Sequence, residues 1–214
     1  MHHAIRTLAV ALLLLGSAWA VANPPSAQQV VQETSERMID ALTANQDRIK
    51  TDRSYLFSLV EEIVLPHFDF ERMSSWVLGK HWRTATPEQR AKFTKEFRNL
   101  LVRTYGTAMA EYSGQKIVYL PFRAPPNAND VTVKTQIEQE GGQPISISYS
   151  LYLKDNDWKV YDVVIENTSL VANYRSSFAT EIKNGGLDGL IAKLETRSQQ
   201  ALTGGANGAT GAAQ

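Results

Sequence analysis

Residues 145–165 read ISISYSLYLKDNDWKVYDVVI, and this stretch decides the fold. In its first half every second residue is apolar, which is the period of a strand with one apolar face. The apolar positions there are Ile145, Ile147, Tyr149, Leu151 and Leu153. A polar turn, Lys154–Asp157, follows, and the second half is apolar at nearly every residue. The pattern predicts an antiparallel hairpin whose second strand is covered on both faces.

The second strand of this hairpin carries one acid, Asp162, among apolar residues. Strict alternation along the strand places Trp158, Val160 and Val164 on one face and Tyr161, Val163 and Ile165 on the other. A lone carboxylate in an apolar pocket is how some isomerases hold a general base. Most partly buried acids are instead satisfied by hydrogen bonds or by a Lys or Arg. We favour the second interpretation, because no second acid, base or oxyanion donor can be assigned beside Asp162.

A further strand precedes the hairpin. Val131, Val133, Thr135 and Ile137 alternate with polar residues, and the turn Glu140–Gln143 joins them to Ile145. This predicts antiparallel pairing in a meander of about four strands.

Helical periods flank the strands on both sides. Ser26, Asp52 and Thr86 are placed to cap helices that carry apolar residues to Leu42, to Ile63 and to near Gly114. Pro87 and Gln89 complete the start of the last of these as a proline at N1 and a capping-box partner. A shorter helix is expected from about Asp69 to Leu78, closed by Gly79. After the strands we expect helices at 170–183 and 187–201, separated by Asn184–Gly186.

The predicted fold class is therefore α+β: a curved antiparallel sheet of about four strands cupped against a layer of helices. An apolar cavity between the two layers is expected, although a cup of this kind can also be filled by its own core.

The two ends of the chain differ from the middle. Residues 1–22 have a basic residue, an apolar core and small residues before Ala22, which predicts a secretory signal peptide cleaved after Ala22. Residues 203–214 are rich in Gly and Ala without an apolar period, which predicts a disordered tail. A single domain is expected over residues 23–202.

Composition excludes several classes of function. Lys+Arg 22 against Asp+Glu 22 gives no net charge to attract nucleic acid. The chain has no cysteine, so disulfides, iron–sulfur clusters and thiol catalysis are excluded. The G-x-S-x-G, G-x-x-x-x-G-K, dinucleotide glycine and H-E-x-x-H motifs are absent, and the acids near His67 have loose spacing for a metal site, as does His81. We therefore expect no enzyme, no cofactor and no metal.

The order of several short motifs resembles the MlaC family of periplasmic phospholipid-binding proteins, also called toluene-tolerance auxiliary proteins. The motifs are Leu65–Asp69, Val77–Gly79 with Trp82, Thr86–Gln89 with Phe93 and Phe97, Trp158–Val163, Ser169–Leu170, and Asn173–Arg175 with Phe178. They cover nearly all of the chain after residue 22. One departure is Asn167–Thr168, where many members carry a glycine and a small aliphatic residue.

The resemblance implies a soluble carrier in the periplasm of a Gram-negative cell, with phospholipid as its cargo. It implies transport between an outer-membrane lipoprotein complex and an inner-membrane ABC transporter complex with a lipid-binding ring protein, which maintains the lipid asymmetry of the outer membrane. We expect the carrier to be a monomer.

The hypothesis for the lipid site joins the apolar sheet face to the facing helices. Its residues are Leu101, Tyr105, Met109, Val133, Ile147, Tyr149, Leu151, Val163, Ile165, Val171, Tyr174 and Phe178, with Arg175 at the mouth for a headgroup phosphate. Plain core packing, and for Arg175 a solvated helix position, is the alternative. Two other functions stay open: an isomerase-like enzyme that uses Asp162, and a protein-binding adaptor that carries no lipid.

Overall fold

The computed structural model describes residues 25–125 and 127–203. The elements in chain order are α1 (Ala27–Ala44), α2 (Gln46–Thr51), α3 (Arg53–Ile63), the 3₁₀ turn η1 (Leu65–His67), α4 (Phe70–Leu78), α5 (Lys80–Thr84), α6 (Pro87–Met109), β1 (Ile117–Tyr119), β2 (Asp130–Ile137), β3 (Ile145–Lys154), β4 (Asp157–Ile165), β5 (Thr168–Ser169) and α7 (Leu170–Thr203). The predicted signal peptide and nearly all of the predicted tail lie outside the described residues.

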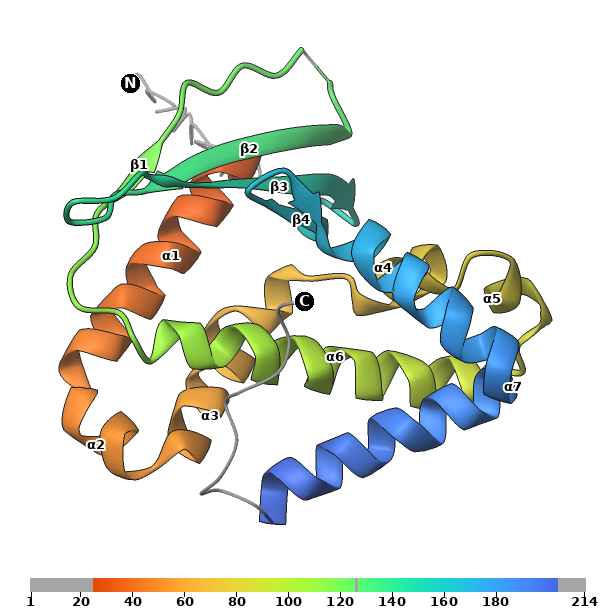
Figure 1. Ribbon diagram of the computed structural model, residues 1–214. Coiled ribbons are helices and arrows are strands. Elements are labelled where there is room, and N and C mark those ends of the chain that lie inside the picture. Colours follow the sequence, from red (N-terminus) through yellow and green to blue (C-terminus); the bar gives the residue numbers. More distant parts are fainter. Residues whose placement is uncertain (1–24, 126, 204–214) are drawn as a thin grey trace, which may run out of the picture.

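The strands form one antiparallel meander in the order β1-β2-β3-β4-β5. In Figure 1 the sheet lies above the long helix α6, α1 descends from the sheet along one side, and α4 and α7 stand on the other. The α+β class is confirmed. Among the described residues the sheet has five strands, compared with about four expected. The three-residue β1 and the two-residue β5 are too short to show a period of two in the sequence.

The predicted helix starts are confirmed by their caps. Ser26 and Thr86 each form a capping box with a glutamine three residues later, and Asp52 accepts a hydrogen bond from the N–H of Ser54. Asp69 caps α4 in the same way through the N–H of Arg72. These interactions are local, so sequence spacing is enough to specify them.

Two helix ends lie at glycines, as the sequence predicts. Gly186 has φ 71 and ψ 177 inside α7, and it divides that helix into the two segments expected from the sequence. Gly79 has φ 55 and ψ −117 and ends α4. The helix α6 ends at Met109 rather than near Gly114, and α2 and α5 were not expected.

The register of the hairpin corrects one prediction. Ser150 pairs with Asp162 but Leu151 pairs with Val160, so Tyr161 is an extra residue in a β-bulge. Val160 therefore lies on the same face as Val163, and the strict alternation expected along this strand is wrong. The prediction that both faces of β4 are covered is confirmed, since Val160 and Tyr161 belong to different core clusters.

Three clusters of buried side chains hold the fold together. The first joins α4, α6 and α7 and contains the packed rings of Phe93, Phe97 and Phe178. The second joins the sheet to α1 and includes Val31, Val133 and Leu151. The third joins α1, α2 and α3, with partly buried side chains of α6 packed against it. Because the clusters are separate, the space where sheet, α1 and α6 approach one another is not closed by one continuous core.

Candidate functional site

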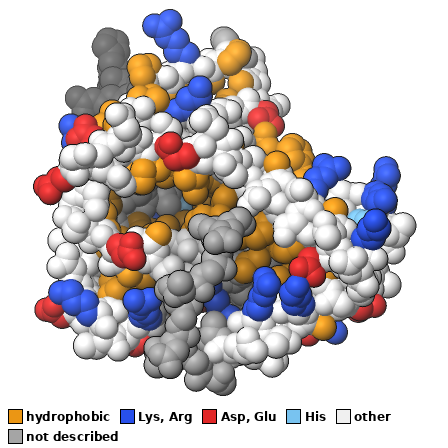
Figure 2. Space-filling view, viewed as in Figure 1, with side chains coloured by type: hydrophobic (Ala, Val, Ile, Leu, Met, Phe, Trp, Pro, Cys, Tyr) orange, Lys and Arg blue, Asp and Glu red, His pale blue; other side chains and the backbone are white. Residues whose placement is uncertain are grey.

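A hollow lies between the sheet, α1 and α6. In Figure 2 the face below the sheet is hollowed, and hydrophobic side chains line the depression. The elements around the hollow carry half-buried side chains that pack against the second and third clusters: Tyr119 in β1, Ile147 and Tyr149 in β3, Ile165 in β4, and Tyr105 and Met109 in α6. The site is apolar, with tyrosine hydroxyls as its polar groups.

The sheet wall of the hollow is set by strand register. Tyr149 stands directly opposite Val133 on one side and Val163 on the other, so all three side chains lie on one face. The next row on this face holds Thr135, Ile147 and Ile165. Val133 and Val163 are buried, whereas Tyr149, Ile147 and Ile165 remain partly accessible. This face therefore contains both buried core residues and residues that solvent or a ligand can reach.

Burial shifts the pKa values of three tyrosines around the hollow. Burial, with the neighbouring Tyr174 hydroxyl as a smaller cause, raises the pKa of Tyr105 to about 12. Burial also raises the pKa of Tyr149 and of Tyr119, although contacts with Thr135 and with Ser35 oppose it. All three phenols are therefore neutral at physiological pH and can donate and accept hydrogen bonds.

The sequence-predicted residues divide into two groups in the structure. The partly buried group packs at the edges of the clusters, with Met109 against the third, Tyr174 against the first, and the others against the second: Tyr105, Met109, Ile147, Tyr149, Ile165 and Tyr174. The fully buried group is packed core: Leu101, Val133, Leu151, Val163, Val171 and Phe178. The core alternative left open by the sequence thus describes the packing of the second group, and a role in lipid contact stays a prediction for both.

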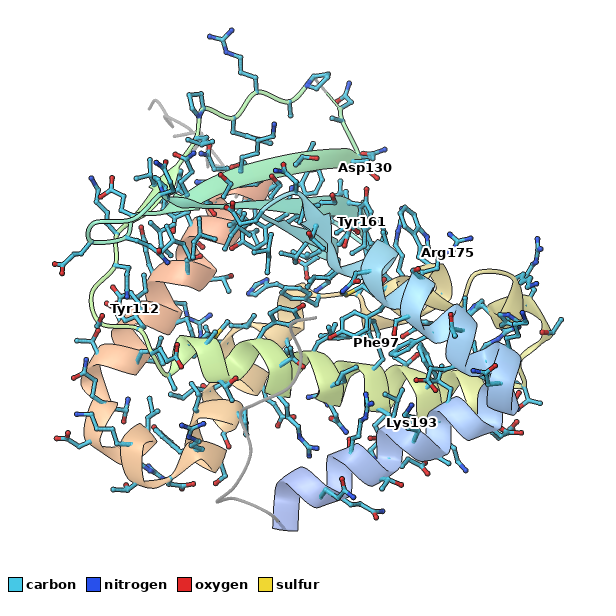
Figure 3. All side chains as sticks on the ribbon, viewed as in Figure 1. Phe97, Tyr112, Asp130, Tyr161, Arg175 and Lys193 are labelled. Atoms are coloured by element: carbon cyan, nitrogen blue, oxygen red, sulfur yellow. The ribbon has the colours of Figure 1, made fainter. Side chains whose placement is uncertain are left out.

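Arg175 is placed apart from the hollow. Its guanidinium lies against Gly79, with Nη2 only 3.1 Å from the position that a Cβ on that glycine would occupy. Figure 3 shows Arg175 on the same side as Asp130 and Tyr161, at the opposite end of the molecule from Tyr112. In this structure the side chain belongs to the junction between α4 and α7, and contact with a headgroup stays a prediction.

Asp162 has a defined structural role. Its Oδ1 accepts hydrogen bonds from the N–H of Val163 (2.9 Å) and of Val171 (3.1 Å), and its Oδ2 accepts one from Ser169 Oγ (2.6 Å). Ser169 Oγ in turn accepts from the N–H of Ala172. The carboxylate thus holds the turn between β4 and α7 and satisfies N–H groups in the first turn of α7. Both oxygens are occupied by the chain itself.

A polar cluster around Arg72 lies on the other face of the sheet. The Arg72 guanidinium carbon is 3.9 Å from the ring centre of Tyr152 and 4.6 Å from that of Tyr161. Tyr161 donates to Asp130, and Tyr152 donates to Asp69. These bonds tie α4 to the sheet and leave the hollow free of charged residues from this cluster.

Sequence reasoning missed two contributors to the hollow. Tyr119 sits in a strand too short to predict, and Ser35 approaches it from α1, which was not assigned to the site. Within residues 25–125 and 127–203 no group of His, Cys, Asp and Glu is arranged to hold a metal ion. In the same ranges no helix is long and apolar enough to cross a membrane.

Comparisons with known proteins agree on one family. The family model described as MlaC protein matches residues 32–196. The intermembrane phospholipid transport system binding protein MlaC of Haemophilus influenzae is 30% identical over 176 residues, which is 81% of this chain and 82% of that protein. The toluene tolerance protein ttg2D of Pseudomonas putida is 28% identical over 160 residues, 74% of each chain. A solved structure, the phospholipid-binding protein from Ralstonia solanacearum in complex with a phospholipid, has a TM-score of 0.77 and 32% identity, and the match covers 83% of this chain and 99% of that one.

Proposed function

Because the chain belongs to the MlaC family, we propose that it binds phospholipid in the hollow between the sheet and the helices and serves as the binding protein of an intermembrane transport system. The observation that carries the proposal is the hollow itself. Hydrophobic side chains line it, the sheet and α6 around it carry half-buried apolar residues, and the fold is shared with a protein that was solved with a phospholipid.

The physical need for such a site follows from the cost of exposing acyl chains to water. A phospholipid with roughly 30 buried methylenes at ~0.8 kcal/mol each has on the order of 24 kcal/mol opposing its escape into water. A bilayer interior and an apolar hollow are both dry, so transfer between them has a small net free energy. The protein can then both load and unload, and the direction of transport comes from its partners.

We propose that the protein works in the periplasm after cleavage behind Ala22, as a monomer that visits an outer-membrane lipoprotein complex and an inner-membrane ABC transporter complex. Its task there is to maintain lipid asymmetry in the outer membrane. The names of the relatives, an intermembrane phospholipid transport protein and a toluene tolerance protein, support this role.

Asp162 favours the carrier over the isomerase-like alternative. A general base needs a free lone pair aimed at the substrate. Both carboxylate oxygens of Asp162 accept hydrogen bonds from the turn that precedes α7, and the acid therefore has a sufficient structural explanation.

Native mass spectrometry tests the proposal directly. The mature protein, purified from a periplasmic extract without detergent, should carry phospholipid at whole-number stoichiometry, and lipid analysis after denaturation should identify it. A bare chain that also takes up no lipid from phospholipid vesicles would reject the carrier and favour the adaptor.

A further inference from the structure

We propose that Tyr149 and Thr135 form a polar subsite inside the apolar hollow. In this subsite the Tyr149 hydroxyl donates a hydrogen bond to an ester carbonyl of a bound diacyl lipid, and Thr135 positions that hydroxyl. The inference rests on the proposed function and adds to it the part of the lipid that the hollow recognises.

Thr135 is the residue that first indicates the subsite. It lies on the apolar face of β2, where Val131, Val133 and Ile137 occupy the equivalent positions. Its side chain is only 2% exposed, and Oγ1 is buried without a hydrogen-bond partner of normal geometry. Buried hydroxyls are nearly always hydrogen-bonded, and a valine of the same shape would fill this position without an unsatisfied group. The hydroxyl therefore calls for a polar partner among its neighbours on this face.

Tyr149 supplies the connection to the hollow. It lies diagonally across the β2–β3 pair from Thr135, near enough for the Thr135 hydroxyl to lower its pKa while burial raises it more. The tyrosine remains partly accessible, unlike Thr135. A molecule in the hollow can therefore contact Tyr149, whereas Thr135 is covered.

Tyr119 and Ser35 form a similar pair of hydroxyls nearby, but their hydrogen bonding differs from that of Tyr149 and Thr135. The hydroxyl of Tyr119 approaches Ser35, but Ser35 already donates a hydrogen bond to the carbonyl of Val31 at 2.8 Å. Thr135 has no such second partner. A phenol has one donor and two acceptor positions. Between the two hydroxyls only one proton can lie in a shared hydrogen bond, so the other needs an acceptor. If Thr135 donates to the Tyr149 oxygen and Tyr149 donates to a ligand, a single ligand acceptor completes the pair.

The chemistry of the subsite selects an ester. The group that fits is an acceptor that carries no charge, because no charged side chain surrounds the subsite on this face: Val133, Ile147 and Val163 are aliphatic, and Tyr119, directly opposite Thr135, is a neutral phenol. A phosphate oxygen is also an acceptor, but a phosphate buried here would lack the cation that stabilises it. The ester carbonyls lie next to the acyl chains in a diacyl lipid, so chains held in the hollow bring them to its wall.

A competition experiment with two lipids tests the subsite. Delipidated protein is incubated with vesicles that contain equal amounts of phosphatidylglycerol with two ester-linked chains and its analogue with two ether-linked chains of the same length. Native mass spectrometry then gives the ratio of the two bound species. Because the analogue keeps the phosphate and loses only the carbonyls, wild type should favour the ester by about two- to tenfold.

Variants assign the preference to the two residues. Tyr149→Phe and Thr135→Val should each bring the ratio to about one, the double variant should go no further, and Thr135→Ser should keep the wild-type ratio. Thr94→Val is the matched control, because Thr94 Oγ1 is another buried hydroxyl without a partner but lies in α6, outside the sheet. It should leave the ratio unchanged. Urea unfolding of each variant checks that the fold is intact.

Two results would overturn the subsite. One is equal uptake of both lipids by wild type, and the other is a Thr94→Val variant that loses the preference as fully as Thr135→Val does. Uptake of neither lipid by wild type has a different meaning, since it would overturn the proposed function and the subsite with it.

Discussion

Removing the Asp162 carboxylate should destabilise the protein without abolishing lipid binding. Asp162→Ala removes the acceptor of three hydrogen bonds, from Val163 N–H, Val171 N–H and Ser169 Oγ. Hydrogen bonds to a charged group contribute about 1.5–3 kcal/mol each, and partial exposure reduces that sum, so we expect a loss of about 2–4 kcal/mol in the free energy of unfolding. For a domain of this size the loss corresponds to a fall in Tm of the order of 10 °C.

The assay pairs urea unfolding with lipid occupancy by native mass spectrometry. Asp162→Asn keeps an oxygen for the N–H groups and should lose less stability than Asp162→Ala. Asp40→Ala, which removes an exposed acid from α1, is the control for charge and should change neither quantity. Unfolding of Asp162→Ala at the wild-type urea concentration would show that Asp162 does not stabilise the start of α7. An enzymatic activity that wild type shows and that a folded Asp162→Ala variant lacks would refute the proposal that the protein is a carrier.

Three further predictions test other parts of the structure. Met109→Arg places a charge at a half-buried position of α6, the helix that borders the hollow. It should lower lipid occupancy at least about tenfold, because an unpaired cation is costly in an apolar site. Ala91→Arg, on the exposed face of the same helix, should leave occupancy unchanged. Gly79→Ala should lower the free energy of unfolding by about 1–3 kcal/mol, measured in urea, because a Cβ there is strained at φ 55 and lies 3.1 Å from the Arg175 guanidinium. Adding Arg175→Ala to this variant should recover only the part of the loss that is due to the contact. Burial would raise the pKa of Asp69, but hydrogen bonds from its neighbours outweigh it and hold the pKa below the ordinary value, so this stabilisation is complete above the ordinary pKa and is lost as the pH falls through the folded one. The urea midpoint of wild type should therefore fall more steeply below about pH 4 than that of Asp69→Asn, and parallel profiles would contradict the assignment.

Local signals explain why so much of the secondary structure was predictable. The caps at Ser26, Asp52 and Thr86 and the turn at Lys154–Asp157 depend on residues within three or four positions of one another. The alternation along β2 and β3 is equally local, and it gave the correct face for Ile147 and Tyr149. The short elements β1, β5, α2 and α5 span too few residues to establish a period, so they were missed.

The sequence by itself therefore determined the helices, the hairpins, the apolar face of the sheet and the resemblance to one family. Only the tertiary structure decided which apolar side chains close into core and which line the hollow. Leu101 and Met109 lie on the same helix and are both apolar, yet one is buried and the other half-buried. The bulge at Tyr161 and the unpartnered hydroxyl of Thr135 were decided in the same way. The physical reason is that burial depends on neighbours from distant parts of the chain, whereas a cap or a turn depends on neighbours in sequence.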